Sequence, residues 1–571
     1  MKTIKRTSLL TLLWLLSYTL FSQESVVTID SIFFHKDESK GIILINKDVQ
    51  ALNTLYPEIK NRIRAEGVEY TFALPLPHFE IGTAYPVTNP SHENFELYFT
   101  QLPIVHIDTI EPIVDEPRVY AHFSICETNG NVIEQGIGVE YRGGSTQAFP
   151  KKSLRIEFWK DETGNDTENI SLLGMRSDDD WNLQAMYNEP LRMRTKIGFA
   201  LWNQMDTLYY WEDEPKAVNG VHQKYVELFI SDQYRGVYTL SERIDRKQLR
   251  LKKSENGAIA GELYKSKYWG EATSFHSLPP YDNNSESWGG YNYIYPKDTI
   301  DWANLYDFVG FVIQSDSATF YAHYPDRFIM DNAVNYFIFT NLLRARDNIV
   351  KNLFVARYQK DAPYFYVPWD LDGTLGITWK GEQEDITTDM VSSRFYDRLM
   401  GDTIFTNKLT KRWNNLRKTV ISTDSIVYAF NHYYHYLNSN GVYERESKAW
   451  EAYDLDYTGN IQYLSNWTDN RIHYLDSIFN NLPGTGIYSP LTPPAFAISI
   501  YPNPASDFLT IKLSGSESQL SDISLFNTLG NCLLHTKHRH INISALEQGL
   551  YFVVVDEENG NRQVSKLWIA R

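Results

Sequence analysis

Residues 331–376, DNAVNYFIFTNLLRARDNIVKNLFVARYQKDAPYFYVPWDLDGTLG, indicate how the rest of the chain is organised. Apolar and aromatic residues recur between Asn335 and Leu343 at a spacing that predicts a helix buried on one side, ending near Arg344. A polar loop and a turn at residues 361–363 follow. The run YFYVPWDLDG, residues 364–373, then predicts a buried strand that carries carboxylates to its end.

Those carboxylates belong to Asp370 and Asp372, which share one face of an extended chain because they are two residues apart. Two neighbouring carboxylates are costly to bury without a compensating cation, so the pair predicts a Mg²⁺ or Mn²⁺ site. Upstream, Asp347 precedes Asn352 by the interval that protein kinases use for their catalytic Asp and metal-binding Asn. Such an Asp can deprotonate a hydroxyl and such an Asn can offer an uncharged oxygen ligand, which suits phosphoryl transfer.

Each motif taken alone also has an interpretation without a catalytic function. A D-x(4)-N pair occurs by chance in many proteins. The DLDG turn could cap a strand or begin a calcium loop, although no Glu stands where an EF-hand needs one. It is the order of helix, Asp, Asn, strand and acidic turn that favours the functional interpretation.

Several further motifs surround the central stretch: YRGGS at 141–145 with PKKS at 150–153, LGM at 173–175 with DWNL at 180–183, and VELFISDQYRGVYTLSERI at 226–244. Together they resemble the spore-coat CotH family of atypical secreted protein kinases, over most of residues 80–480. The resemblance implies a kinase-like fold, with Asp347 as the catalytic Asp and Asp370 as the principal metal ligand.

The first of these motifs predicts a nucleotide-binding turn at Arg142, Gly143, Gly144 and Ser145. The glycines let backbone amides approach an anionic ligand, and Arg142 adds positive charge. A Gly-Gly turn by itself is only a turn, so the interpretation depends on the lysines that follow it.

Lys151 and Lys152 open the expected strand SLRIEF, as a strand lysine does when it reaches nucleotide phosphates. We choose Lys152 as the catalytic lysine. Lys151 and Arg155 stay open as alternatives, because adjacent strand residues point to opposite faces and the phase is not fixed by the sequence.

Arg192 and Arg194 lie at the start of a helix expected from about Pro190. They could form salt bridges with the acidic run Asp178–Asp180, or one of them, Arg192, could face the phosphates as the family resemblance implies. This helix offers no obvious Glu to replace the αC Glu of ordinary kinases. The usual Lys–Glu pair is therefore in doubt.

Residues 226–244 predict a β-hairpin turning at residues 232–236, whose exit would form the hinge. Glu242 there could bind ribose or be a solvated charge. Residues 254–300, rich in Gly, Asn, Ser and Trp, indicate a long insertion at the substrate rim. Helix-like spacing at Ile386–Leu399, Phe405–Arg417, Ser422–Leu437 and Gly459–Phe479 would complete a C-lobe.

The chain ends carry export signals. Residues 1–23 combine a basic start with a short apolar run, which predicts a secretory signal peptide. Residues 496–571 contain YPNP at 501–504, GLYF at 549–552 and a basic end SKLWIAR, and resemble a type IX secretion C-terminal sorting domain. That resemblance implies transit through the periplasm and outer membrane by the type IX machinery, to the medium or the cell surface, with the tail removed.

Composition narrows the partners. The formal charge of −17 argues against nucleic acid and anionic membranes, which need a basic patch. The two cysteines, Cys126 and Cys532, provide no disulfide framework. No stretch after the signal is long and apolar enough to span a bilayer, so we expect no stable membrane span in the mature chain.

The expected architecture is α+β: the signal peptide, a β-rich region at 24–117, an atypical protein-kinase-like two-lobed core at 118–481, a linker at 482–495 and a small β-sandwich sorting domain at 496–571. The expected activity is phosphate transfer from ATP to hydroxyls of a protein substrate, with a divalent metal. ATP is scarce outside the cell, so a catalytically inactive kinase-like surface or extracellular binding protein is the alternative. A carbohydrate-active enzyme with paired carboxylates is a third hypothesis.

Overall fold

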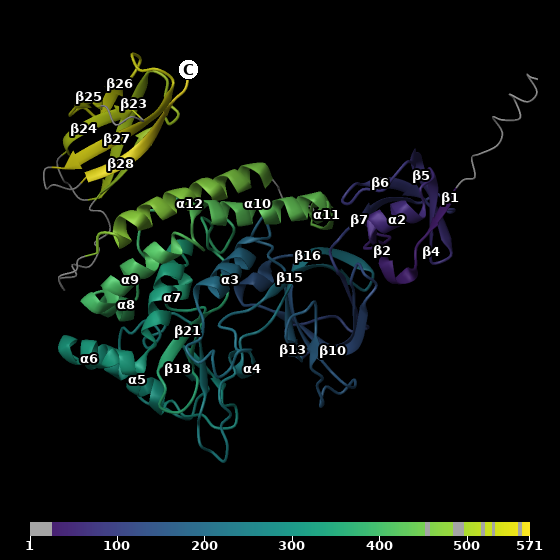
Figure 1. Ribbon diagram of the computed structural model, residues 1–571, viewed down its shortest axis with the longest axis horizontal. Coiled ribbons are helices and arrows are strands. Elements are labelled where there is room, and N and C mark those ends of the chain that lie inside the picture. The colour runs from purple at the N-terminus through teal and green to yellow at the C-terminus, as the bar shows by residue number, and fades with distance from the viewer. Residues whose placement is uncertain (1–24, 451–456, 483–495, 516–519, 528–531, 558–561) are drawn as a thin grey trace, which may run out of the picture. The chain divides into compact units, whose positions relative to one another are not determined.

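A computed structural model describes residues 25–450, 457–482, 496–515, 520–527, 532–557 and 562–571 of the chain. The expected signal peptide and almost all of the expected linker lie outside these residues. The chain divides into two compact units, Met1–Gly486 and Ile487–Arg571, and is mixed α+β as expected (Figure 1).

The first strands form a seven-stranded sheet in the order β1-β4-β5-β6-β7-β3-β2. Its elements are β1 Ser25–Thr28, β2 Phe34–Asp37, β3 Ile42–Ile45, β4 Lys60–Ala65, β5 Val68–Leu76, β6 Tyr85–Thr88, β7 Asn94–Phe99 and the helix α2 Val49–Leu55. The α2 helix begins where the Asp48 side chain accepts hydrogen bonds from two first-turn amides. Aliphatic and aromatic residues together fill its core, and the region is β-rich as expected.

Next comes a closed barrel of seven strands in the order β10-β11-β14-β16-β15-β8-β9. The strands are β8 Ile104–Asp108, β9 Val119–Cys126, β10 Val132–Arg142, β11 Ser153–Phe158, β14 Asp180–Gln184, β15 Gln223–Ile230 and β16 Gln233–Ser241. Along β11, Leu154, Ile156 and Phe158 are buried in the barrel while Arg155 and Glu157 alternate outward. The first barrel strand, β8, lies before the expected boundary at residue 117.

The expected hairpin is present as β15 and β16, but its turn is tighter than expected. Ser231 and Asp232 both have positive φ, 46° and 60°, and Gln233 already pairs with Ile230. Two consecutive positive φ values match the two-residue turns that fit the twist of a hairpin. The turn therefore ends before Gly236.

A second, five-stranded sheet has the order β18-β19-β17-β20-β21. It consists of β17 Glu262–Ser266, β18 Ser287–Trp288, β19 Tyr291–Tyr295, β20 Leu353–Arg357 and β21 Tyr364–Pro368. The interpretation of residues 254–300 as an insertion is thus wrong, because this segment supplies three strands, one of them central. These strands are short and lie between Gly- and Asn-rich turns, so their tertiary pairing cannot be recognised from the sequence pattern.

Helices pack on this sheet and also on the barrel strand β16 (Figure 1). They are α3 Arg194–Met205, α4 Arg246–Leu249, α5 Ala303–Gln314, α6 Ser317–Arg327, α7 Met330–Leu343, α8 Arg394–Leu399, α9 Thr403–Leu416, α10 Thr423–Ser439, α11 Val442–Ala449 and α12 Tyr457–Phe479. The α7 helix ends at Arg344, in the left-handed conformation, as predicted. In contrast, α8 is shorter than the expected Ile386–Leu399, because Ser393 is extended. None of the helices in the described ranges has the length and apolar character to cross a bilayer.

The second unit consists of two sheets around one apolar core. One sheet contains β22 Phe496–Tyr501, β23 Phe508–Gly515 and β26 His540–Asn542, and the other β24 Leu520–Asn527, β25 Cys532–Thr536, β27 Gly549–Glu557 and β28 Arg562–Ile569. Buried residues from both sheets, including Leu509 and Val553, share that core. This arrangement agrees with the expected small β-sandwich.

Candidate functional site

The acidic motifs meet at one edge of the five-stranded sheet. In the register, Ser266 of β17 lies opposite Leu353 of β20, which lies opposite Pro368 of β21. The antiparallel pairing therefore brings the end of β17, the start of β20 and the end of β21 to the same edge. Backbone bonds join them: the Asn352 amide donates to the Ser266 carbonyl at 2.9 Å, and the Trp369 amide donates to the Asn352 carbonyl at 3.0 Å.

Asn348 holds the two acidic loops together, and sequence reasoning missed it. Its side chain is fully buried, and its amide donates to the carbonyl oxygens of Asn352 at 2.8 Å and Trp369 at 2.6 Å. A buried amide between an Asp and an apolar residue carries no spacing signal of its own. The Asp-Asn sequence beside the motif was the available hint.

The predicted metal ligands Asp370 and Asp372 follow β21 directly. Asp370 is exposed and has a left-handed φ of 54°, a conformation that Asp and Asn tolerate better than other side chains. Burial and the negative charge of Asp370 together raise the pKa of Asp372 to about 7, whereas Arg142 opposes the shift. A carboxyl group held partly protonated beside a second carboxylate fits a place where a cation is to bind.

Arg142 and Lys265 supply the cations that act on this pair. Burial lowers the pKa of Lys265 to about 8, with Asp370 acting in the opposite direction and Arg142 in the same direction. Burial also lowers the pKa of Arg142, again opposed by Asp370. The Arg142 guanidinium lies over the Trp369 ring, 5.5 Å from its centroid. Further positive charges that act on this group come from Arg155, Arg243 and Lys267.

This concentration of positive charge beside two carboxylates suits a bound polyphosphate with a metal ion. Arg142 was among the predicted nucleotide contacts. Lys265 was not, because its strand lies in the segment that the sequence pattern presented as an insertion.

Asp347, the predicted catalytic residue, begins a short 3₁₀ helix, Asp347–Ile349, just before Asn352. Its Oδ1 accepts a hydrogen bond from Trp269 Nε1 at 3.2 Å, and its Oδ2 lies 2.8 Å from Lys351 Nζ. About a third of the side chain is exposed, 33%. Asp347 is therefore oriented by two neighbours and still reachable from solvent.

Lys151 and Arg192 bind a different partner, Glu446 of α11. Lys151 Nζ lies 2.8 Å from Glu446 Oε1, and Arg192 Nη2 lies 2.9 Å from Glu446 Oε2, with all three side chains buried. Burial lowers the pKa of Lys151 to about 7, although Glu446 opposes this shift. These contacts favour a structural role for both cations, whose assignment to nucleotide binding stays a prediction.

Arg194 forms a second buried pair, with Glu189, and also donates to the Leu375 carbonyl at 3.2 Å. The suggested pairing of Arg192 or Arg194 with residues 178–180 is thus absent: Asp178 instead pairs with Arg176 and Lys247.

Lys152 and Glu242 have internal partners too. The Lys152 ammonium donates to the Gln147 carbonyl, and the side chain lines a cavity of about 330 Å³ on the barrel. The lining of that cavity includes neither Asp347 nor Asp370. Glu242 is buried and accepts four hydrogen bonds. They come from the backbone amides of Arg176 and His222 and from the side chains of His222 and Gln248.

The predicted glycine turn follows β10. Gly143, Gly144 and Ser145 are exposed, and Gly143 has a φ of 116°. A Cβ at Gly143 would lie 2.3 Å from Thr146 Oγ1, so the turn requires glycine there.

Taken together, the fold and the site define a mixed α+β protein in which an acidic loop pair at a sheet edge faces clustered arginine and lysine. Residues 139–475, more than half of the chain, match the family described as CotH kinase protein, and the chain belongs to this family. Residues 499–570 match the secretion system C-terminal sorting domain, which indicates type IX export to the cell surface or beyond. No curated protein matches the chain.

Proposed function

We propose that this protein is a secreted kinase that transfers the γ-phosphoryl group of ATP to protein hydroxyls, with Mg²⁺ or Mn²⁺. The observation that supports this most is the pair Asp370 and Asp372 facing Arg142 and Lys265. We further propose a two-lobed kinase-like core, in which the barrel corresponds to the N-lobe and the five-stranded sheet with its helices to the C-lobe.

Asp370, Asp372 and the side-chain oxygen of Asn352 are suitable ligands for a hard divalent ion, and the raised pKa of Asp372 fits a group awaiting a cation. Such an ion, when bound, neutralises charge on the transferred phosphoryl group. Arg142 and Lys265 bind and orient the phosphates. Lys152 and the turn Gly143–Ser145 stay predicted nucleotide contacts, whereas the buried internal partners of Lys151, Arg192 and Glu242 favour structural roles over the nucleotide contacts predicted for them.

Asp347 acts on the acceptor. Its carboxylate accepts the proton of the acceptor hydroxyl while that oxygen bonds to the γ-phosphorus and ADP leaves. Trp269 and Lys351 orient the carboxylate through the contacts described above. General-base help of this kind is typically worth about 100-fold to 10,000-fold in rate.

A second function, as an inactive kinase-like binding protein, is favoured by the same contacts of Asp347. Both of its oxygens have partners from within the chain, and a hydroxyl must displace one or share it. Nucleotide binding without transfer would then be the retained property.

The test compares nucleotide affinity, by calorimetry with Mg²⁺ or Mn²⁺, with incorporation of labelled phosphate. Asp370→Asn should weaken both, and Asp347→Asn should spare binding far more than transfer. Asp361→Asn is the matched control, because Asp361 is exposed and also left-handed, with φ of 60°. Absence of metal-dependent ATP binding in the wild type would reject the kinase; binding without any transfer would favour the second function.

A further inference from the structure

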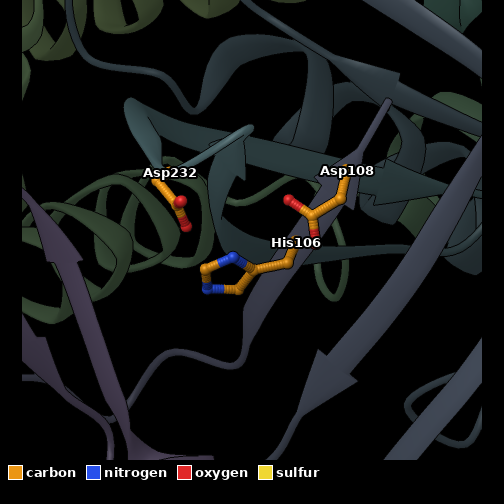
Figure 2. Close-up of side chains that lie close together, drawn as sticks. All are labelled: His106, Asp108 and Asp232. Atoms are coloured by element: carbon orange, nitrogen blue, oxygen red, sulfur yellow. The ribbon is translucent and has the colours of Figure 1, made fainter. Parts of the chain in front are cut away.

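A second group of ligand atoms lies on the barrel. His106 and Asp108 are two residues apart on β8 and share its outer face. The alternate residues of the strand, Val105 and Ile107, point into the core. Asp232 joins them from the β15–β16 turn. Figure 2 shows the three side chains pointing toward one another, and their ligand atoms lie within 4.8 Å of each other. Within the described part of the chain, this is the one such group of three.

The backbone fixes this juxtaposition. Strand β15 runs parallel to β8, with Ile230 opposite Ile107, and the Ser231 amide donates to the Ile107 carbonyl at 3.0 Å. The tight turn with positive φ at Asp232 then places its carboxylate beside the end of β8. The group is therefore built on two paired strands.

The His106 ring is held in one orientation by neighbours outside the group. Phe229 stacks on it with centroids 4.8 Å apart and planes 8° from parallel. His106 Nε2 lies 2.7 Å from Nδ1 of His35, which is 7% exposed and belongs to β2 of the N-terminal sheet. Only Nδ1 of His106 is then left for Asp108 and Asp232.

The hydrogen-bond partners of the two rings determine which ring nitrogens carry protons. The side-chain NH₂ group of Asn46 donates to the Cys126 carbonyl at 2.8 Å. The Asn46 Oδ1 therefore faces His35 Nε2, at 3.4 Å, and accepts a hydrogen bond from the N–H of that nitrogen. Neutral His35 therefore accepts at Nδ1, and His106 must donate from Nε2. A neutral His106 then presents a lone pair on Nδ1 toward two carboxylates.

We propose that His106, Asp108 and Asp232 bind a divalent transition-metal ion such as Zn²⁺ or Mn²⁺. Three acceptors gathered without a donor favour a positive charge between them. One imidazole nitrogen and two carboxylates form a donor set that suits these ions better than Mg²⁺, and solvent can complete the coordination because both Asp residues are exposed. The chain from Asn46 through His35 to His106 is the outer-shell support that metal-binding histidines usually have.

The position of the group defines its role. His35 comes from the N-terminal sheet, whereas His106 and Asp232 come from the barrel. An ion bound there orders the barrel face on which that sheet is packed. We therefore assign it a structural role, separate from the acidic loops at Asp370 and Asp372.

The test measures metal binding to the purified full chain by calorimetry with Zn²⁺, Mn²⁺ and Mg²⁺. To remove the other proposed metal site, every measurement is repeated in an Asp370→Asn background. We expect one Zn²⁺ or Mn²⁺ per chain to persist there, with a raised melting temperature and, after loading with Co²⁺, visible absorption from the bound ion. Asp108→Asn and Asp232→Asn should each weaken binding more than tenfold, and Asp213→Asn, at another exposed carboxylate, should not.

His35→Gln tests the outer shell and should weaken the metal affinity about 10-fold to 100-fold. Because His35 is buried, circular dichroism must first show that this variant is folded; the exposed Asp232 variant does not depend on that outcome. If no transition-metal ion binds in the Asp370→Asn background, or if Asp108→Asn and Asp232→Asn bind as the wild type does, the site is refuted. His106 would then be a protonated partner of two carboxylates.

Discussion

Replacing Glu446 with Gln should show whether its two buried partners, Lys151 and Arg192, stabilise the fold or bind a nucleotide. The Glu446 carboxylate is 1% exposed and accepts four hydrogen bonds: one from Lys151 at 2.8 Å, two from Arg192 at 2.9 and 3.1 Å, and one from the Val237 amide at 2.6 Å. Gln keeps the shape but loses the charge and turns an NH₂ group toward donors. Two buried cations would then lack compensation, which typically costs about 3–5 kcal/mol of stability.

The free energy of unfolding is measured with urea. Glu444→Gln, on the same helix but half exposed at 49%, is the control and should cost less than about 1 kcal/mol. Lys151→Met combined with Glu446→Gln should recover part of the loss, because one unpaired charge is removed, with a coupling of about 0.5–3 kcal/mol. Nucleotide affinity of each folded variant should remain that of the wild type.

Two results would refute this reasoning. The first is a Glu446→Gln variant as stable as the Glu444→Gln control, which would mean that the network does not hold the fold. The second is a Lys151→Met variant that keeps wild-type stability and loses ATP binding. Lys151 would then be a nucleotide contact, as the strand-lysine interpretation of the sequence allowed.

Four further outcomes are expected. Asn348→Ala should cost about 1–3 kcal/mol by leaving the buried Trp369 carbonyl without its donor, measured by urea unfolding. Gly198→Ala should destabilise α3 packing, because a Cβ there would lie 2.7 Å from Leu371 Cδ1, and should also weaken ATP binding through the adjoining acidic loop. Burial raises the pKa of Asp178 to about 6, so its stabilising contribution is complete below about pH 4 and is lost as the pH rises through 6; Asp178→Asn should flatten that fall in a pH series of unfolding curves. Deleting residues 496–571 should leave a folded protein trapped in the cell envelope, and its appearance outside the cell would contradict the export role of the tail.

The acidic loops could be predicted from the sequence because their geometry is local. Asp347 and Asn352 are separated by five positions, and Asp370 and Asp372 by two, so one loop and one strand end fix each pair. The existence and the end of helix α7 were also predictable, but its burial was not: every residue from Asn332 to Leu343 is buried, so the helix expected to be buried on one side is buried all round. Their position at the same sheet edge was not predicted, because it depends on the pairing of β20 with β17 and β21, and β20 was not among the expected strands.

The basic side of the site could be predicted only in part, because Arg142 was expected but Lys265 comes from a distant strand. Lys265 meets Asp370 only through the pairing of β17 with β20, and Glu446 meets Lys151 across 295 positions. The choice between Lys151 and Lys152 stays a prediction for a related reason. Both precede β11, which begins at Ser153, so alternation along the strand does not determine where either side chain points.

The sequence showed no Glu in α3 for the αC role of ordinary kinases, and Lys151 pairs with Glu446 instead. Ordinary kinases join a strand lysine to a Glu of that helix. Here the buried partner of Lys151 comes from α11, which also places Arg445 against Glu227 in a fully buried pair. A lysine neutralised in this way contributes little positive charge to a polyphosphate. We infer that Arg142 and Lys265, whose charges act on the acidic loops, take over phosphate binding in this protein.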